Sequence, residues 1–425
     1  MSGPGADPSG TAAPAPARPS ALLRTFHAFT YRDYRLLWAG AFTSSVGTWM
    51  QEVAQNWLIL TMTGSAFLLG LDAFLGDAPF LAFSLFGGVL ADRMDRRRIL
   101  LISQAVQLTS AFLLAGLILA NAVQIWIILA LSFIVGFAQS FGGPAYQALV
   151  PTLVDRKDLG NAVALNSIQF NLARVIGPVL AGIAFYKLGP AACFGLNGLS
   201  FLAVIAALLS LKRGAHERGT ITQEPVLESL KAGLRAVSQA RALRGLIALA
   251  FVGSFCALPL VTFLPIFARE VFHGNARGYS GLLAAFGIGA VAGAIGVAGF
   301  GQVRRKGIVA VAMQMVFGAL TVAFALSRSS VLSHAILVAA GAALMVVFAM
   351  FMTLVQSNVE DRLRGRVVSV YSLAFRGAMP LGNLAAGFLA TLMPAPRVLI
   401  LDGAVLLAVG AFVLLRRTPE GVTSL

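Results

Sequence analysis

Charge is scarce in this 425-residue sequence, because aspartate, glutamate, lysine and arginine together make up 12% of it, whereas hydrophobic residues make up 58%. A soluble domain carries about a quarter charged residues, so an ordinary soluble globular protein is excluded. The mean hydropathy is correspondingly high, at +0.83. We therefore expect most of the chain to face lipid or other apolar helices.

Cysteine and histidine are also scarce, with two cysteines and four histidines in the whole chain. Cys193 and Cys256 lie in apolar runs without metal-ligand spacing, so neither a disulfide framework nor a zinc site is expected. The phosphate-binding loop Gly-x-x-x-x-Gly-Lys-[Ser/Thr] does not occur, which argues against an ATP-driven pump. Catalytic spacing of His, Cys, Ser or acidic residues is missing too, so we expect no enzyme, no cofactor and no metal.

The sequence contains twelve apolar segments, in two sets of six that are separated by a polar interval. Helices are the economical structure for them, because a helix satisfies its own backbone hydrogen bonds in lipid. We therefore predict an all-α membrane protein with twelve transmembrane helices in two pseudo-symmetric six-helix bundles. The segments lie near 35–62, 66–91, 98–120, 123–150, 159–187, 190–211, 243–268, 277–302, 308–327, 331–356, 366–393 and 397–415.

This pattern predicts five parts along the chain. The first is a disordered cytoplasmic tail over 1–30, since its start is rich in Pro, Gly and Ala and has no apolar core. The bundles are expected over 31–211 and 243–417, followed by a short tail over 418–425. In the linker, 212–242, leucines and a valine recur at helical spacing around Lys231 and Arg235, which predicts an amphipathic helix at the membrane surface. A regulatory partner site there is the alternative.

Basic residues predict the orientation. With a cytoplasmic N-terminus, 25 of the 32 lysines and arginines lie in cytoplasmic segments and 5 lie on the other side. This bias is a strong positive-inside signal. The net charge of +15 therefore requires no nucleic-acid partner, and attraction to anionic lipid headgroups follows from the same bias. We expect a multi-pass protein of the cell (bacterial inner) membrane with both termini cytoplasmic.

The two halves of the sequence look alike. A shift of 205 residues superimposes Leu149 on Leu354 and Gly160 on Gly365, and it also aligns glycines in the fifth and eleventh segments. These matches indicate a parallel duplication of a six-helix unit, an arrangement found in secondary transporters. Chance identities in a glycine-rich membrane sequence are the alternative.

The stretch GGVLADRMDRRR follows the second apolar segment. It resembles the signature G-x-x-x-D-R-x-G-R-R of the major facilitator superfamily, although Asp95 stands where the signature has glycine. The wider context, including GPAYQALVP and ARVIGPVLAG, resembles the branch that contains enterobactin exporters and drug and macrolide efflux proteins, over about Tyr31 to Arg417. The signature residues are Gly88, Asp92, Arg93, Arg96 and Arg97.

The resemblance implies that this motif gates the protein. The family places Asp92 near the start of the eleventh span, where a helix N-terminus carries about half a positive charge. Asp92, helped by Arg366, would then latch one half onto the other while the cytoplasmic side is shut. Simple anchoring of a hydrated loop is the alternative.

ARVIGPVLAG resembles the fifth-span motif G-x-x-x-G-P-x-x-G-G, which is associated with antiporters. Gly177, Pro178 and Gly182 match, Arg174 lies within the motif, and alanines replace two glycines. The family packs this span against the eighth, so we expect close contact through small residues there, including Gly289 and Gly293. Structural packing without a transport role is the alternative.

Ionisable residues in apolar segments are costly unless they are paired or face water, so they mark a functional path. Glu52 and Arg174 lie at matching heights, and Asp77 and Arg376 lie in spans that the family places side by side. We predict ion pairs between Glu52 and Arg174 and between Asp77 and Arg376, which protons or substrate would break. Structural pairs that never titrate are the alternative. The same path includes a polar stripe at helical spacing, Gln51, Gln55 and Asn56.

These features predict a secondary active transporter that exports a small amphipathic compound, such as a drug or a siderophore, by alternating access in exchange for protons. We expect a monomer whose partners are its substrate, the proton and the lipid bilayer. A lipid or lysophospholipid flippase, or a transporter that does not export, is the alternative on the same scaffold.

Overall fold

The protein is helical throughout the described part of the chain, which in this computed structural model comprises residues 26–212, 226–299 and 305–415. Most of the predicted tails and residues 213–225 of the predicted linker lie outside these ranges. The long helices are α2 (Arg32–Thr63), α3 (Ala66–Arg93), α4 (Arg96–Leu119), α5 (Ile125–Leu149), α6 (Leu159–Leu188), α7 (Pro190–Ser210), α9 (Arg241–Ile266), α10 (Ala276–Gly299), α11 (Lys306–Leu326), α12 (Ser330–Ser357), α13 (Asp361–Leu392) and α14 (Ala395–Leu415). The shorter helix α8 (Val226–Gln239) lies within the linker.

Short polar or glycine connections separate the helices. The Ser65 hydroxyl accepts a hydrogen bond from the Leu68 amide at the start of α3, and the Asp95 carboxylate accepts one from the Arg97 amide at the start of α4. Asp95 therefore caps a helix at the position where the superfamily signature has glycine. Gly64 and Gly189 adopt φ values of +62° and +82°, which glycine tolerates and which allow the chain to reverse direction.

Ten of the described helices are long and apolar enough to cross a membrane. The long helices α2 and α13 are not among these ten, because polar side chains lower their hydropathy. Glu52 lies in the middle of α2 and Arg376 in the middle of α13. The two helices that are least suited to lipid are therefore those that carry residues of the predicted path.

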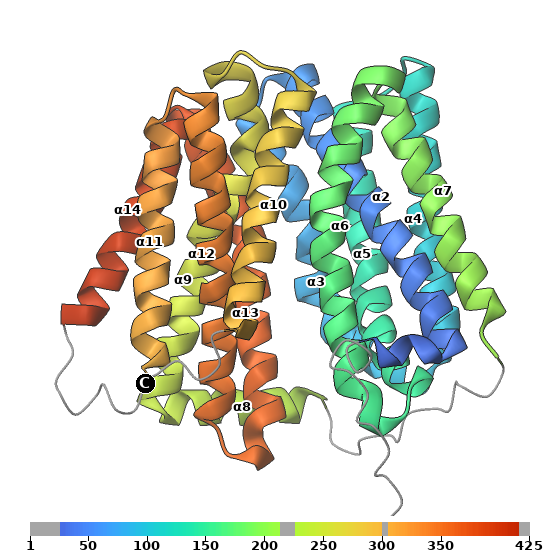
Figure 1. Cartoon of the computed structure of the whole chain (residues 1–425), viewed down its shortest axis with the longest axis vertical. Coiled ribbons are helices and arrows are strands. Elements are labelled where there is room, and N and C mark those ends of the chain that lie inside the picture. Colours follow the sequence, from blue (N-terminus) through green and yellow to red (C-terminus); the bar gives the residue numbers. More distant parts are fainter. Residues whose placement is uncertain (1–25, 213–225, 300–304, 416–425) are drawn as a thin grey trace, which may run out of the picture.

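The long helices pack in two groups, a first helix group (α2–α7) and a second helix group (α9–α14), which stand side by side in Figure 1. In the first group α3 packs on α5, α4 on α7, and α2 on α6. The second group repeats these contacts in the same order, with α10 on α12, α11 on α14, and α9 on α13. The two groups meet mainly where α3 packs on α13 and α6 packs on α10.

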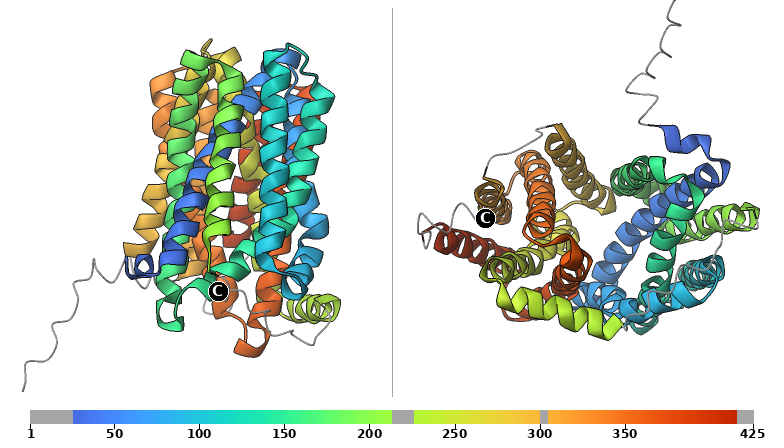
Figure 2. Two further views of the ribbon diagram at one scale, coloured as in Figure 1. Left: turned by 90° about the vertical axis from the view of Figure 1, so that its right-hand side faces the viewer. Right: turned by 90° about the horizontal axis from the view of Figure 1, so that it is seen from below.

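The two ends of the molecule differ. At one end, which we call the α8 end, α8 runs across the bottom of the second group and the described chain begins and stops (Figures 1 and 2). The other end, which we call the opposite end, carries the connections between α2 and α3, between α6 and α7, and between α13 and α14.

Candidate functional site

The four charged residues predicted in mid-span lie at the interface between the helix groups. Glu52 on α2 is close enough to the charges of Asp77 on α3 and Arg174 on α6 to interact with both, and Asp77 is close enough to Arg376 on α13. Glu52, Asp77 and Arg376 are nevertheless exposed. Because helices of both groups surround them, this exposure indicates a space between the groups that a water molecule can reach.

The two arginines lie over aromatic rings. The Arg174 guanidinium is 5.2 Å from the Trp49 ring centroid and 5.5 Å from that of Phe286, which belongs to the other helix group. The Arg376 guanidinium is 4.6 Å from the Phe80 ring centroid, again across the interface. A cation over an aromatic face gains about 1 kcal/mol or more when it is desolvated. Both arginines therefore have partners other than carboxylates.

The predicted ion pairs are not formed in this conformation. Among the described residues, neither Glu52–Arg174 nor Asp77–Arg376 has a nitrogen–oxygen distance within 4.0 Å. Both guanidinium groups lie over aromatic rings instead, and the buried Arg174 Nε has no hydrogen-bond partner. The carboxylates of Glu52 and Asp77 are thus left facing the space between the groups.

The polar stripe on α2 divides among three neighbouring helices. Gln51 accepts a hydrogen bond from Asn197 of α7 at 2.7 Å, whereas Asn56 donates one to the Tyr279 hydroxyl of α10 at 3.2 Å. Gln55 donates to Asp72 of α3 at 2.8 Å. These three side chains therefore join α2 to its neighbours.

A buried carboxylate that the sequence analysis did not select lies beside this stripe. Asp72 is 5% exposed, and Ser132 Oγ of α5 donates to its Oδ1 at 2.6 Å while Gln55 donates to its Oδ2 at 2.8 Å. A carboxylate with a donor for each oxygen is well satisfied. The signal in the sequence was the acid itself, in an apolar segment, but its donors come from two other helices whose register a single sequence does not give.

The groups are sealed together at the opposite end. Arg269, just after α9, donates to the Leu60 carbonyl oxygen of α2 at 2.6 Å. Trp57 stacks on Tyr279 with ring centroids 6.4 Å apart. At Gly70 of α3 the backbone of α13 comes so close, at the Asn383 carbonyl, that no side chain could fit. These contacts separate the mid-span charges from that end.

One residue of the antiporter-like motif, Gly182, contributes to the same seal, whereas Gly177 packs within the first helix group. Gly177 packs against the backbone of α2 at Val46, and Gly182 faces Ser280 of α10. The expected contact between α6 and α10 is therefore present. The prediction that Gly289 and Gly293 of α10 make this contact was wrong, however. They face the backbone of α12, at Val338 and Ala342. Gly287 of α10 does face α6, at the Arg174 carbonyl oxygen.

The arginines of the predicted gating motif bind helix ends within the first group. Arg96 donates to the Ala148 carbonyl oxygen at 2.9 Å, near the end of α5, and Arg97 donates to the Leu209 carbonyl oxygen at 2.8 Å, at the end of α7. Cations at helix C-termini are favourable, because the carbonyl groups there are unpaired and partially negative. The surroundings of Gly88 and the side chains of Asp92 and Arg93 lie outside what the structure describes.

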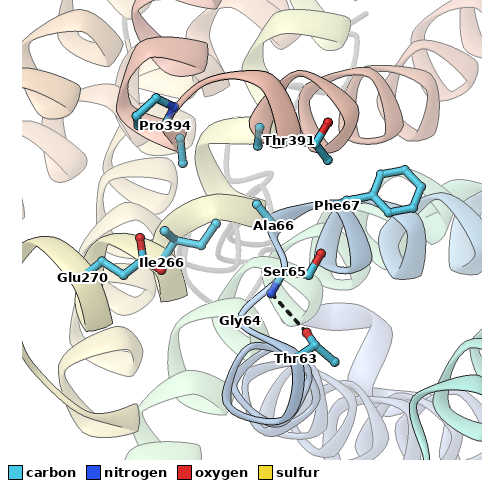
Figure 3. Close-up of a pocket in the computed structure, with 11 residues that line it drawn as sticks. Thr63, Gly64, Ser65, Ala66, Phe67, Ile266, Glu270, Thr391 and Pro394 are labelled. Carbon is cyan, nitrogen blue, oxygen red and sulfur yellow. Dashed lines mark hydrogen bonds between the residues drawn. The ribbon is translucent and has the colours of Figure 1, made fainter.

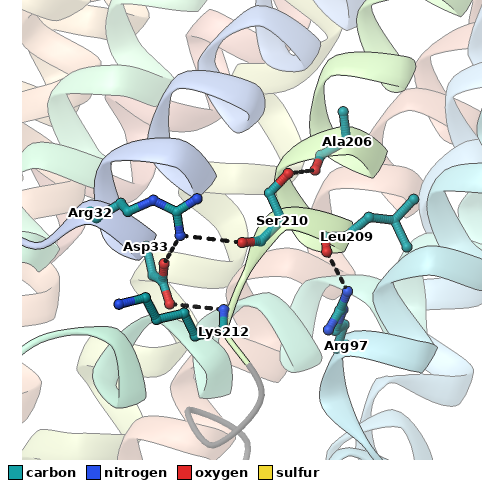
Figure 4. A network of polar contacts seen from close by, with 7 residues as sticks. All are labelled: Arg32, Asp33, Arg97, Ala206, Leu209, Ser210 and Lys212. Atoms are coloured by element: carbon teal, nitrogen blue, oxygen red, sulfur yellow. Dashed lines mark hydrogen bonds and ion pairs between the residues drawn. The ribbon is translucent and has the colours of Figure 1, made fainter.

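The end of α7 is held by a second arginine as well (Figure 4). Arg32 donates to the Ser210 carbonyl oxygen at 3.4 Å and forms an ion pair with Asp33 at 3.1 Å. Asp33 in turn accepts a hydrogen bond from the Lys212 amide at 3.1 Å. The start of α2 and the end of α7 are thereby tied together at the α8 end.

A pocket of about 360 Å³ opens at the opposite end (Figure 3). It lies between the connection from α2 to α3, the end of α9 and the connection from α13 to α14, and Glu270 is its one ionisable lining residue. None of the mid-span charges lines it. This pocket is separated from the charged site by the seal described above.

Comparison with known proteins gives a consistent result. The family model described as "Transmembrane secretion effector" matches residues 24–424. The multidrug efflux pump Tap of Mycolicibacterium fortuitum is 26% identical over 84% of this chain and 88% of its own length. Macrolide efflux protein A of Streptococcus pyogenes is 21% identical over 89% of this chain and 95% of its own length.

Solved structures show the same fold. The nucleoside transporter NupG superimposes with a TM-score of 0.72 at 12% identity, over 91% of this chain and all of NupG. A bacterial homologue of the human lysosomal transporter Spinster, inward-facing and occupied, superimposes with a TM-score of 0.71 at 15% identity, over 92% of this chain and 99% of its own.

Proposed function

The chain belongs to the transmembrane secretion effector family of the major facilitator superfamily, and from this premise we propose that it exports a small amphipathic compound by alternating access, in exchange for protons. The observation that carries the proposal is the set of exposed mid-span charges between two helix groups that are sealed at one end. Charges at that depth are costly unless they face water or a partner. The relatives that are drug and macrolide efflux proteins support export of a small compound.

The proposed architecture has twelve spans in two six-helix bundles, 31–211 and 243–417, joined by the linker. In it α2 and α13 span the membrane although they are less apolar, since their polar faces line the path. The shared order of contacts in the two helix groups supports the duplication.

The α8 end is the cytoplasmic end in this proposal, as the distribution of lysine and arginine indicates. We propose that the path opens to the cytoplasm in the present conformation, because the contacts between the groups described above lie at the opposite end. Protonation of Glu52 or Asp77 removes a negative charge from the path, and substrate that binds the same charges competes with the proton. When the opposite end opens, the proton enters and the substrate leaves.

The arginines of the path respond to this exchange. In the present conformation they lie over Trp49, Phe286 and Phe80. Because two of these rings belong to the other helix group, rocking of the groups moves the rings relative to the guanidinium groups. We propose that the ion pairs Glu52–Arg174 and Asp77–Arg376 form in the outward-open conformation and not in this one. The Asp92 latch would act at the α8 end when that end closes.

The proposal is tested by reconstituting the protein in liposomes and measuring efflux of macrolides and siderophores with and without an imposed pH gradient. Net transport of at least one compound that rises with the gradient supports proton exchange. Transport whose rate does not depend on the pH gradient contradicts the coupling to protons. Movement of lipid alone between the leaflets favours the flippase.

A further inference from the structure

Helix α8 is fixed at the level of the membrane surface by its position in the chain. Its last residue, Gln239, is separated by one residue from Arg241, which begins α9. The helix α9 is one of the ten that can cross a membrane. α8 lies across the end of the molecule and at its rim in both views of Figure 2. It therefore runs along the membrane plane, beside the headgroups.

The inner side of α8 is docked on α13. A Cβ atom added to Gly233 would lie 2.6 Å from the carbonyl oxygen of Arg366 and 3.0 Å from the Val370 side chain. Only a glycine allows this approach, so the backbones of the two helices touch. Arg366 is in the second turn of α13, the helix that also carries Arg376. A displacement of α8 is thus transmitted directly to a helix of the path.

Among the side chains that the structure describes, the outer side of α8 combines an exposed leucine with basic residues. Leu234 is 53% exposed, and Lys231 and Arg235 are exposed beside it. Lys231 forms an exposed ion pair with Glu228 at 3.1 Å, whereas Arg235 has no ion pair among the described residues. Arg241 and Arg244 continue the exposed positive charge into the first turn of α9.

We propose that this outer side of α8 (Lys231, Leu234, Arg235) binds anionic phospholipid headgroups, and that the contact between Gly233 and Arg366 makes transport respond to the lipid composition of the membrane. The charge of the surface complements phosphate, and the exposed Leu234 is suited to insertion among acyl chains while its basic neighbours reach the headgroups. The proposal rests on the membrane orientation given under the proposed function, in which α8 faces the cytoplasmic leaflet.

Lipid binding is measured without any substrate, on purified full-length protein in mixed micelles, by native mass spectrometry with phosphatidylglycerol and with phosphatidylcholine. The test variant is Lys231→Gln/Arg235→Gln. Its control, Arg328→Gln/Arg397→Gln, removes the same charge from exposed positions at the opposite end. Each basic residue near an anionic surface contributes about 1 kcal/mol, so two lost charges weaken phosphatidylglycerol binding roughly thirtyfold. Equal binding by the test and control variants overturns the proposal.

The coupling of α8 to transport through the contact between Gly233 and Arg366 is measured separately, as the rate of transport in liposomes with and without phosphatidylglycerol. Gly233→Leu forces α8 away from the Arg366 carbonyl, so we expect the variant to keep the lipid affinity and lose the dependence of the rate on phosphatidylglycerol. If the rate depends on phosphatidylglycerol equally in Gly233→Leu and in the wild type, the proposed coupling through this contact is overturned. Absence of transport in the wild type under all conditions would contradict the proposed function instead, and the binding result would stand.

Discussion

The two ends of the molecule are held in different ways. At the opposite end the contacts join the helix groups to each other, through Gly70 and Asn383, Gly182 and Ser280, and the hydrogen bond from Arg269. At the α8 end the described contacts of Arg96 and Arg97, and the docking of α8, lie within one group. The described contacts at the opposite end thus join the groups to each other, whereas those named here at the α8 end hold elements of a single group together. This difference is what the proposed alternating access requires, since in that proposal the groups separate at one end at a time.

The largest expected effect belongs to the charges that lie between the two ends. We expect Glu52→Gln/Asp77→Asn to fold normally and to lose gradient-driven efflux by about a hundredfold, the lower range for a positioned proton-transfer group. The matched control is Glu270→Gln, an exposed acid outside the path. Efflux in liposomes at a fixed pH gradient is the measurement. If the double variant transports like the control, the coupling by these two residues is contradicted.

Next in size is a change to the seal itself. Gly70→Val places a side chain against the Asn383 carbonyl, and such overpacking costs about 1–3 kcal/mol. We expect the seal to open and the opposite end to become accessible to a membrane-impermeant thiol reagent at a reporter cysteine. Gly76→Ala on the same helix is the control, because nothing lies within 4 Å of its added Cβ. Equal labelling in the two variants would show that this contact does not hold the groups together.

A smaller loosening is expected from Arg269→Gln. The variant removes the hydrogen bond to the Leu60 carbonyl oxygen, which for an exposed charged donor is worth about 1 kcal/mol, or roughly a fivefold change in the equilibrium between open and sealed forms. The same thiol-accessibility assay measures it, with Arg277→Gln as the control in the neighbouring exposed segment. An unchanged accessibility in Arg269→Gln would remove Arg269 from the seal.

At the α8 end the corresponding substitution should act on stability alone. Arg97→Gln removes a cation from the end of α7, and we expect it to lower the free energy of unfolding by about 0.5–1 kcal/mol, as for other charges at helix ends. Thermal unfolding in detergent measures this loss. A large loss of transport at unchanged stability would show instead that Arg97 acts in gating, as the resemblance implies.

The smallest effect is a local dependence on pH. The Tyr31 hydroxyl, which donates at 2.7 Å, and then His27 hold the pKa of Asp158 below its usual range at the α8 end. A carboxylate with a lowered pKa contributes stability above its ordinary pKa of about 4 and loses it as the pH falls through the lowered value. We expect the difference in unfolding temperature between wild type and Asp158→Asn to shrink below that pH. If this difference in unfolding temperature stays constant as the pH falls, the stabilising effect of Tyr31 and His27 on the Asp158 carboxylate is contradicted.

The sequence predicted the helices well. The segment 35–62 became α2 (Arg32–Thr63) and 331–356 became α12 (Ser330–Ser357), because hydropathy and chain reversals determine both ends. The four mid-span charges were found on the same principle, since an ionisable residue in an apolar segment stands out. The predicted close packing of α6 on α10 is also present.

What the sequence could not predict depends on how each helix is rotated. Gln55 donates to Asp72, and Gly289 faces α12 instead of α6. The rotation of a helix about its own axis decides which neighbouring helix each residue faces, and the composition of the helix does not determine that rotation. The ion pairs were predicted from depth alone. Depth does not reveal that aromatic rings such as Phe80 lie beside the arginines. The sequence also contained no signal for the docking of Gly233 on α13.

Alternating access is tested most directly by two distances measured on the same protein, with spin labels in a background in which Cys193 and Cys256 are replaced by alanine. One pair, Lys157→Cys/Glu360→Cys, spans the groups at the α8 end, and the other, Asn121→Cys/Arg328→Cys, spans them at the opposite end. When a pH change drives the protein through its cycle, we expect the first distance to shorten while the second lengthens. Two distances that stay fixed, or that change in the same direction, would contradict the account.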